Sequence, residues 1–262
     1  MIKRSLVSLA ALTVVSLAAA GCGSSGGDSS SSGLDLVQDG TLTVCSDVPY
    51  APFEDFDKSS SLGFKGFDVD IVSAVAKGMG LDLKIQDQDF DGLQSGLTLN
   101  AGTCDLVASA MTITDDRKKN LEFSEGYYDS KQSLLVPEGS AIKGIDDLDG
   151  KKVGVQQGTT GKAYAEENAD GAEIVTFPSD AEEFQAIKAG QVDALLQDLP
   201  VNLTHQQAGG FTIVQQFDTD EEYGFAAKKG NTALIDAVNE QLDKLKKDGD
   251  YQKIYNKYFK LS

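Results

Sequence analysis

Apolar and polar positions follow two periods along the chain, one typical of β-strands and one typical of α-helices. Short apolar runs bounded by polar turns predict buried strands. Between these runs, apolar residues recur roughly every three or four positions, as on the buried side of an amphipathic helix. The predicted strands cover 41–46, 81–86, 105–109, 131–137, 152–155, 173–177 and 192–196. The clearest predicted helices cover 67–79, 180–189, 199–208, 231–247 and 250–259.

The order of these elements predicts an α/β fold made of two units. Strands and helices alternate up to about residue 126, and a second series begins with the strand at 131. Such alternation is typical of sheets that carry helices on their faces. Open α/β sheets bind ligands outside the carboxyl ends of their strands, so the loops that follow strands are where a site is expected.

Two segments precede the predicted fold. Residues 1–21 combine a basic start, an apolar run that is short for a membrane span, and small residues before Cys22, as in a secretory signal. A cysteine at this place resembles a bacterial lipoprotein signal, in which Cys22 is lipidated and becomes the mature N-terminus. Ordinary secretion with an incidental cysteine is the alternative. Residues 22–33 are nearly all Ser and Gly, which predicts a flexible tether at a membrane surface.

The chain is strongly acidic. It carries 41 Asp and Glu against 23 Lys and Arg, which gives a formal charge of −18 at pH 7. Residues 1–21 hold two of the basic residues and no acid, so without them the charge is −20. This acidity argues against nucleic acid or anionic lipid as a partner, although one buried arginine can still bind an anion. About 229 residues follow the tether, enough for one large domain or two small ones.

The stretch SAMTITDDRKKNLEFS, residues 109–124, is the first candidate for a binding segment. It follows a buried strand and combines small and hydroxyl residues, Ala110 and Thr112 among them, with Arg117. The guanidinium fork matches both oxygens of a carboxylate, which the ammonium group of a lysine cannot do. A solvated surface charge is the alternative role for Arg117, because two lysines follow it directly.

Two further strand ends carry an acid. Asp47 lies on a loop with two prolines and the aromatic residues Tyr50 and Phe53, each of which is either part of the core or a face for an aliphatic ligand stem. Asp198 follows the strand at 192–196. Its carboxylate is a candidate to accept from an α-ammonium group, and its alternative role is to cap the helix that follows.

A Gly/Thr-rich turn in the second unit is a third candidate. QQGTTG, residues 156–161, joins a strand to a helix that is expected to start near Lys162. Such a turn places hydroxyls and backbone N–H groups, here around Gln156, Thr159 and Thr160, at a helix N-terminus, where anions bind. The turn lacks the lysine of a P-loop, so by itself the signal is weak.

Catalytic and metal-binding patterns are not predicted. His205 is the only histidine and lies in a predicted helix, so no histidine-containing triad and no metal-ligand cluster can be assembled around it. Asp68 and Asp70 occupy the first turn of a predicted helix, where carboxylates favour the positive end of the dipole. They are therefore interpreted as capping residues. No cofactor and no metal are expected.

Four motifs resemble the family-3 solute-binding proteins of polar amino-acid ABC transporters: TITDDRKK, GFDVDI, DFDGL and EGYY. The resemblance runs from residue 34 to the C-terminus and is closest to the glutamine-binding proteins. It implies an α/β, two-lobed, periplasmic-binding-protein-like fold of type II, with two crossings near 127–130 and 222–225. The implied first lobe is discontinuous, and the two lobes comprise 34–126 plus 226–262, and 131–221.

The same resemblance implies capture of a free polar L-amino acid between the lobes and its delivery to an ABC permease whose ATPase is a separate chain. Asp47, Gln156 and Gln197 would surround the ligand's side chain, with no cation among them, so glutamine or a basic amino acid is expected and an acidic one is not. The implied ligand-binding residues are Asp47, Tyr50, Phe90, Ala110, Thr112, Arg117, Gln156, Thr159, Thr160 and Asp198.

No enzymatic activity is implied, and the protein is expected to be a monomer on the extracytoplasmic face of the cell membrane. A lipid anchor would be its only contact with the membrane, and nucleic acid is not an expected partner. Two alternatives remain at this stage. One is an extracytoplasmic enzyme on the same scaffold, similar to a cyclohexadienyl dehydratase, and the other is a ligand-sensing receptor domain.

Cys45 and Cys104 remain after lipidation of Cys22. An extracytoplasmic location permits a disulfide. Cys45 lies late on its predicted strand and Cys104 just before its own, so parallel strands in simple register would separate their Cα atoms by more than the roughly 7 Å that a bridge allows. The sequence leaves this bridge open.

Overall fold

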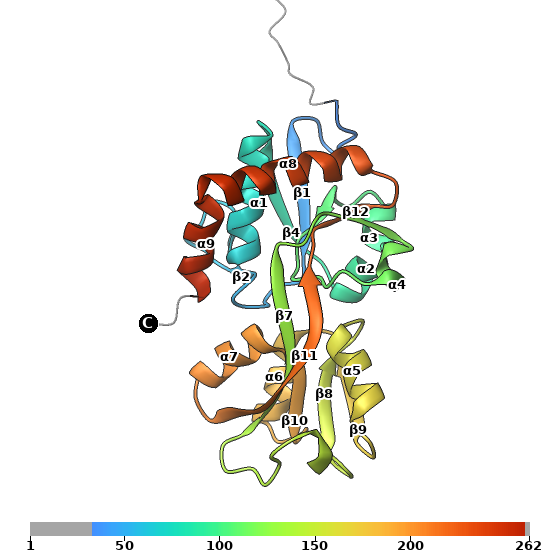
Figure 1. The fold of residues 1–262 in the computed structure, drawn as a ribbon, viewed down its shortest axis with the longest axis vertical. Coiled ribbons are helices and arrows are strands. Elements are labelled where there is room, and N and C mark those ends of the chain that lie inside the picture. The colour runs from blue at the N-terminus through green and yellow to red at the C-terminus, as the bar shows by residue number, and fades with distance from the viewer. Residues whose placement is uncertain (1–32, 260–262) are drawn as a thin grey trace, which may run out of the picture. The chain divides into compact units, whose positions relative to one another are not determined.

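The computed structural model describes residues 33–259, which form two lobes, each built around a five-stranded sheet (Figure 1). The predicted signal peptide and Cys22 lie outside the described residues. In the first lobe, three parallel strands are followed by two strands that are antiparallel to each other. The order across this sheet is β4 (Asp82–Asp87), β1 (Thr41–Ser46), β5 (Leu106–Val107), β12 (Ala226–Lys228) and β6 (Leu121–Phe123).

The sheet of the second lobe is also mixed. Its middle strand β10 lies parallel to β8 and antiparallel to β7, and β8 lies parallel to β9. The aliphatic residues of β7, β8 and β10 are fully buried, as the apolar runs predict. The order across the sheet is β11 (Phe211–Tyr223), β7 (Tyr128–Pro137), β10 (Ala194–Asp198), β8 (Lys152–Gln156) and β9 (Glu173–Phe177).

The long strands β7 and β11 connect the two lobes. They pair antiparallel, with Phe211 opposite Pro137 at one end and Tyr223 opposite Tyr128 at the other. Figure 1 shows both strands running from the second sheet toward the first lobe. The chain therefore enters the second lobe through β7 and returns through β11, which is the two-crossing arrangement expected from the sequence.

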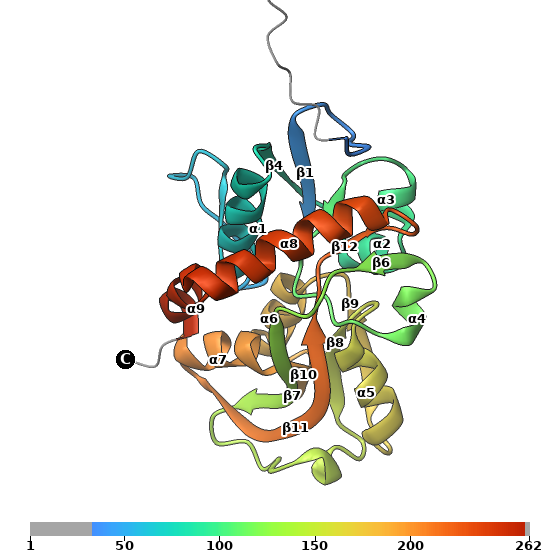
Figure 2. The same ribbon diagram turned by 45° about the horizontal axis from the view of Figure 1, so that its top comes forward.

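Helices cover both sheets. In the first lobe they include the two C-terminal helices, and Figure 2 shows α8 lying across this lobe, where it contacts α1, β6 and β12. The first lobe holds α1 (Phe67–Gly78), α2 (Phe90–Gln94), α3 (Leu97–Asn100), α4 (Asp115–Lys118), α8 (Thr232–Asp248), α9 (Asp250–Phe259) and the hairpin β2 (Asp55–Phe56) and β3 (Phe64–Lys65). The second lobe holds η1 (Ile145–Asp147), α5 (Thr160–Asn168), α6 (Asp180–Lys188) and α7 (Leu199–Gln207).

The segment between β4 and β5 forms two short helices, α2 and α3. Gly96 separates α2 from α3 with a left-handed backbone (φ 81°), a conformation that an L-residue with a side chain rarely adopts. Among the helices of residues 33–259, none is long and apolar enough to cross a membrane.

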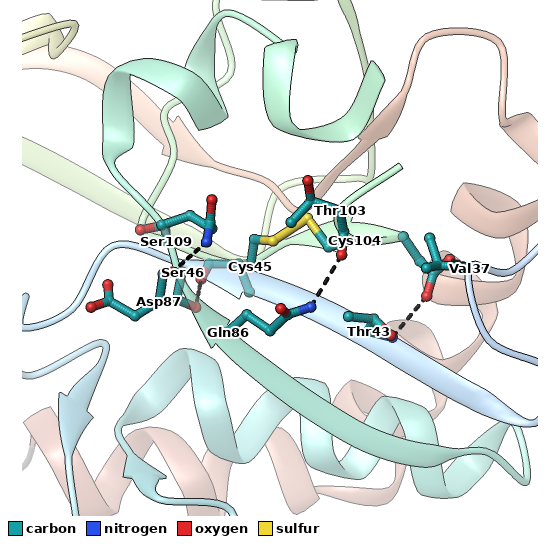
Figure 3. The surroundings of a disulfide bond; sticks show 12 residues. Val37, Thr43, Cys45, Ser46, Gln86, Asp87, Thr103, Cys104 and Ser109 are labelled. Carbon is teal, nitrogen blue, oxygen red and sulfur yellow. Dashed lines mark hydrogen bonds between the residues drawn. A yellow bond between two sulfur atoms is a disulfide. The ribbon is translucent and has the colours of Figure 1, made fainter. Parts of the chain in front are cut away.

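Cys45 and Cys104 form a disulfide, with Cα atoms 5.9 Å apart (Figure 3). Cys45 is paired with Val107 across the parallel strands, so an extended chain would place Cys104 too far away. The chain before Asp105 is not extended, because it leaves α3 through a turn, and Gln86 holds this turn by donating to the Thr103 carbonyl oxygen (3.1 Å). The register argument against the bridge failed because it assumed extended backbone at Cys104.

Candidate functional site

A small enclosed cavity lies between the lobes, at the carboxyl ends of their strands. It is lined by residues of β8 and β10, of the loops that follow β1, β5 and β8, and of α2, α4 and α5. All ten residues of the implied ligand-binding set lie in this lining, whereas Gln197, which was expected beside the ligand's side chain, does not. The lining residues are Asp47, Tyr50, Phe90, Ser109, Ala110, Thr112, Arg117, Gln156, Thr159, Thr160 and Asp198.

Arg117 is buried at one end of this cavity. It is 6% exposed, whereas the side chain of its neighbour Lys118 is 53% exposed, so Arg117 is not the solvated charge of the alternative interpretation. Nη1 donates to the Thr112 carbonyl oxygen (2.7 Å), and Nη2 donates to the Gly158 carbonyl oxygen of the second lobe (2.9 Å). The guanidinium carbon lies 5.2 Å from the centroid of the Phe90 ring. Burial lowers the pKa of Arg117 to about 10, so this group is still a cation at neutral pH.

Asp198 contributes the second buried charge of the cavity. It precedes α7, yet its carboxylate makes no capping hydrogen bond to that helix. Oδ2 accepts instead from the hydroxyls of Tyr50 (2.9 Å) and Tyr223 (2.5 Å), and Oδ1 accepts from Gln132 Nε2 (2.5 Å). Burial, together with the nearby charge of Glu221, raises the pKa of Asp198 to about 7. The side chain is therefore part of the cavity and not a helix cap.

Asp47 and Gln156 meet across the cavity from opposite lobes. Gln156 Nε2 donates to Asp47 Oδ2 (2.5 Å) and to the Pro178 carbonyl oxygen (3.1 Å). Burial raises the pKa of Asp47 to about 7, although the hydrogen bond from Gln156 acts in the opposite direction. Near neutral pH this carboxyl can thus be present in either protonation state, and its charge is open to influence by a ligand.

Glu221 is a buried residue beside the cavity that the sequence analysis missed. Its Oε2 accepts from Thr112 Oγ1 of the first lobe and from Thr160 Oγ1 of the second, both at 2.7 Å. Its Oε1 accepts from Gln132 Nε2 (3.0 Å). In the sequence it belongs to an acidic run, DTDEE, which looks like a solvated strand face. Only the pairing of β11 with β7 turns this one acid inward, so no local signal could have found it.

Thr159 and Ala110 complete the two loops that approach the cavity. Thr159 Oγ1 caps α5 by accepting from the Lys162 N–H (3.1 Å), and it also donates to the Gln156 carbonyl oxygen (2.8 Å). Ala110 has a left-handed backbone (φ 43°), which is unfavourable for a residue with a Cβ. Such a conformation persists only where the surrounding structure holds it.

Three interpretations from the sequence need correction. Asp68 does not cap α1, because its carboxylate is fully buried and accepts from the Ala110 N–H (2.9 Å) and the Tyr127 hydroxyl (2.7 Å). Gln197 does not line the cavity, since its Nε2 donates to Asn202 on α7 (3.0 Å).

Asp70, the other acid in the first turn of α1, bonds to residues of the C-terminal helix α9 and does not cap α1. Its Oδ2 accepts from Lys257 Nζ (2.6 Å) and from the Tyr258 hydroxyl (2.9 Å), which fastens α9 to α1. Phe53, for which two roles were considered, belongs to the core: it is fully buried, and its ring packs against Phe67.

Comparison with known proteins gives a consistent set of matches. Residues 42–261 match the model of the bacterial extracellular solute-binding proteins, family 3. The chain is 35% identical to the ABC transporter glutamine-binding protein of Bacillus subtilis (98% of this chain, 96% of that one). It is 34% identical to a probable histidine-binding protein of Neisseria gonorrhoeae (95% and 94%).

Solved structures give the same picture. An ancestral arginine-binding protein, solved with glutamine and with arginine bound, is 38% identical and has a TM-score of 0.79 (84% of this chain, 98% of that one). An ancestral amino acid-binding protein described as a precursor of cyclohexadienyl dehydratase is 40% identical, with a TM-score of 0.78 (84% and 96%).

Proposed function

Because the chain belongs to the bacterial extracellular solute-binding proteins of family 3, we propose that it captures one polar amino acid between its lobes for an ABC importer. It is a binding protein and not an enzyme, since the named relatives are substrate-binding proteins. The dehydratase-like alternative is not favoured on the same grounds.

The observation that carries the proposal is a buried guanidinium and a buried carboxylate in the lining of one small cavity. An α-amino acid is a zwitterion, so Arg117 pairs with its carboxylate and Asp198 with its ammonium group. Charge-assisted hydrogen bonds of this kind are among the strongest that proteins make. The hydroxyls of Thr112, Thr159 and Thr160 and the backbone at Ala110 lie beside Arg117 and complete the carboxylate end.

Closure of the lobes on the ligand exchanges one set of hydrogen bonds for another. In the structure described above, direct hydrogen bonds link the lobes from Tyr50 to Asp198, from Gln156 to Asp47 and from Arg117 to Gly158. A bound amino acid takes over donors and acceptors of these groups and thereby bridges the lobes itself. Ligand binding and closure are coupled for this reason.

The ligand's side chain is glutamine or a basic group. Once Arg117 and Asp198 hold the zwitterion, Asp47 remains, and the rings of Tyr50 and Phe90 offer flat faces for an aliphatic stem or a guanidinium. A side-chain carboxylate would instead face Asp47 with only the neutral Gln156 beside it. Like charges a few ångströms apart cost about 4 kcal/mol at an effective dielectric constant near 20.

Competition calorimetry with glutamine, arginine, lysine, histidine and glutamate tests the proposal. Glutamine or a basic amino acid should bind best, and a ligand at a hundredfold its Kd should add about 2.7 kcal/mol to the free energy of unfolding. Arginine should gain on glutamine as the pH rises through about 7, because ionised Asp47 pairs with a cation. Tightest binding of glutamate would contradict the proposed side-chain end, and no binding of any amino acid would contradict the function.

We also propose that Cys22 is lipidated and that this lipid is the protein's only contact with the membrane, on the extracytoplasmic face, where the protein acts as a monomer. The support is the small-residue sequence AAGC at 19–22, followed by the Ser/Gly tether. Fatty-acid labelling of cells should mark the wild-type protein and leave Cys22→Ala unmarked. Equal labelling of both proteins would contradict the anchor.

A further inference from the structure

Two fully buried carboxyl groups lie directly behind the carboxylate end of the cavity. Asp68 of α1 accepts from the Ala110 N–H (2.9 Å), and Glu54 accepts from the Ser109 hydroxyl (2.8 Å). Ser109 Oγ in turn accepts from the Asp47 N–H (3.0 Å). The consecutive cavity residues Ser109 and Ala110 are thus held by this pair, and Asp47 is held in turn by Ser109.

The two acids are neighbours in space. The Asp68 N–H donates to the Phe53 carbonyl oxygen (3.0 Å), and a Cβ on Gly66 would come within 2.8 Å of the Glu54 Cα. The chain before α1 therefore lies against the chain at Glu54. Each acid also has one oxygen, Glu54 Oε2 and Asp68 Oδ1, that is buried and accepts no hydrogen bond.

Such a pair is costly if both groups are ionised. Among the residues that the structure describes, no lysine, arginine or histidine forms an ion pair with either acid. Burial is the main cause that raises the pKa of both carboxyls, and for Glu54 the charge of Asp68 adds to it. The other titratable groups that act on the pair are phenols or acids, namely Tyr127, Tyr251, Asp47 and Asp198. None of them supplies a positive charge.

One shared proton removes this cost. A protonated carboxyl in the pair can donate to the unpartnered oxygen of the other, as in carboxylate dyads where like charges a few ångströms apart cannot both ionise. The ionised partner keeps its acceptor role toward the loop. The left-handed backbone of Ala110, which needs support from its surroundings, then has a charged acceptor for its N–H.

We propose that Glu54 and Asp68 share one proton and, in that state, position residues 109 and 110 for the ligand's carboxylate. This inference rests on the proposed function, because it assigns a supporting role behind the same cavity. Both acids are positioning residues, since neither lines the cavity. Loss of the shared proton at alkaline pH leaves two adjacent charges, loosens the loop and weakens binding.

Isosteric amides test the shared proton. Asp68→Asn or Glu54→Gln replaces the shared proton by an amide N–H that can donate to the remaining carboxylate, so each single variant should keep wild-type affinity for arginine and glutamine within about threefold. The affinity of the wild type should fall at alkaline pH, whereas that of each single variant should not. The ratio of wild-type affinity to variant affinity should therefore decrease as the pH rises above neutral. The double variant has two amides and no carboxylate between them, and it should lose about tenfold or more.

Three further measurements complete the test. Asp68→Ala removes the acceptor of the Ala110 N–H and should lose about tenfold or more in affinity. Asp70→Asn is the matched control on the same helix, because Asp70 pairs with Lys257 and Tyr258 away from the loop, and its affinity should not change. Infrared spectroscopy of the wild type near neutral pH should show one buried carboxylic acid band that is lost in either single amide variant, while the absorption of protonated Asp47 and Asp198 remains.

The outcomes separate this inference from the function it builds on. If wild type binds no amino acid, the proposed function fails, whereas the infrared band still reports on the shared proton. If the wild type binds but the two single amide substitutions each weaken binding and their effects add in the double variant, the shared proton is wrong. It is also wrong if neither single amide variant loses a carboxylic acid band of the wild type. If Asp68→Ala is folded and binds as wild type, the positioning role is wrong.

Discussion

Replacement of Arg117 should remove most of the affinity for every amino acid ligand, whatever its side chain. Arg117→Ala deletes the buried cation of the cavity. Arg117→Lys keeps a cation but loses the fork. The two acceptors of that fork, the carbonyl oxygens of Thr112 and Gly158, belong to different lobes, and a single ammonium group cannot reach both as the guanidinium does.

The size of the loss follows from the bonds that disappear. Hydrogen bonds to charged groups contribute about 1.5–3 kcal/mol each, so the two bonds of a bidentate carboxylate contact amount to about 3–6 kcal/mol. At about 1.4 kcal/mol per factor of ten, Arg117→Ala should weaken binding by about two to four decades. Arg117→Lys should lose about one decade or more. Both variants should remain folded, with a lowered Tm because buried carbonyl oxygens lose a donor.

Isothermal titration with glutamine and arginine at neutral pH measures the effect, and thermal unfolding reports whether each variant is folded. Lys118→Ala is the matched control, because it removes the neighbouring cation, whose side chain is 53% exposed and pairs with Asp115 at the surface (3.7 Å). Its affinity should equal that of the wild type. Folded Arg117→Ala and Arg117→Lys proteins with near-normal affinity would refute the role assigned to this arginine.

Three other predictions concern the second charge, the bridge and pH. Asp198→Asn should keep the fold but bind amino acids very weakly in calorimetry, because the buried ammonium group of the ligand would lose its counter-charge. N-acetylated ligands, which have no ammonium group, should not bind the wild type. Unchanged binding by Asp198→Asn would return Asp198 to a structural role. The Cys45–Cys104 bridge joins residues that are 59 positions apart in the sequence, so its removal in a Cys45→Ala/Cys104→Ala protein should lower the free energy of unfolding by about 4 kcal/mol. Urea titration measures this difference, and equal stability of the two proteins would refute the prediction. Without ligand, Tm should fall as the pH rises from about 4 to 7, because Asp47 and Asp198, whose pKa is raised to about 7 in the folded protein, retain protons that the unfolded chain has released. An Asp47→Asn/Asp198→Asn protein should show a smaller fall in Tm. An equal dependence of Tm on pH in the two proteins would contradict the assignment.

The sequence by itself determined the α/β class and its division into two units, and its motifs, through their resemblance to the family-3 solute-binding proteins, pointed to the two-lobed arrangement and to ten residues that line the cavity. Strand and helix periods are local, because they depend on which side of each element is buried. The polar residues that follow strands were identifiable for a related reason: strand ends in open α/β sheets are where ligands bind, so Asp47, Arg117 and Asp198 could be singled out before any contact was known.

Only the tertiary structure decided what each buried polar group touches. Asp68 sits in a helix N-terminal turn where a cap is the local expectation, yet its partner is the Ala110 N–H, 42 residues away in the chain. Glu221 looks like one of several surface acids until Thr112 and Thr160 converge on it from two lobes. Cys104 reaches its partner because the chain turns between α3 and β5. Hydrogen-bond partners are chosen by how distant segments pack, and a linear pattern carries no record of that choice.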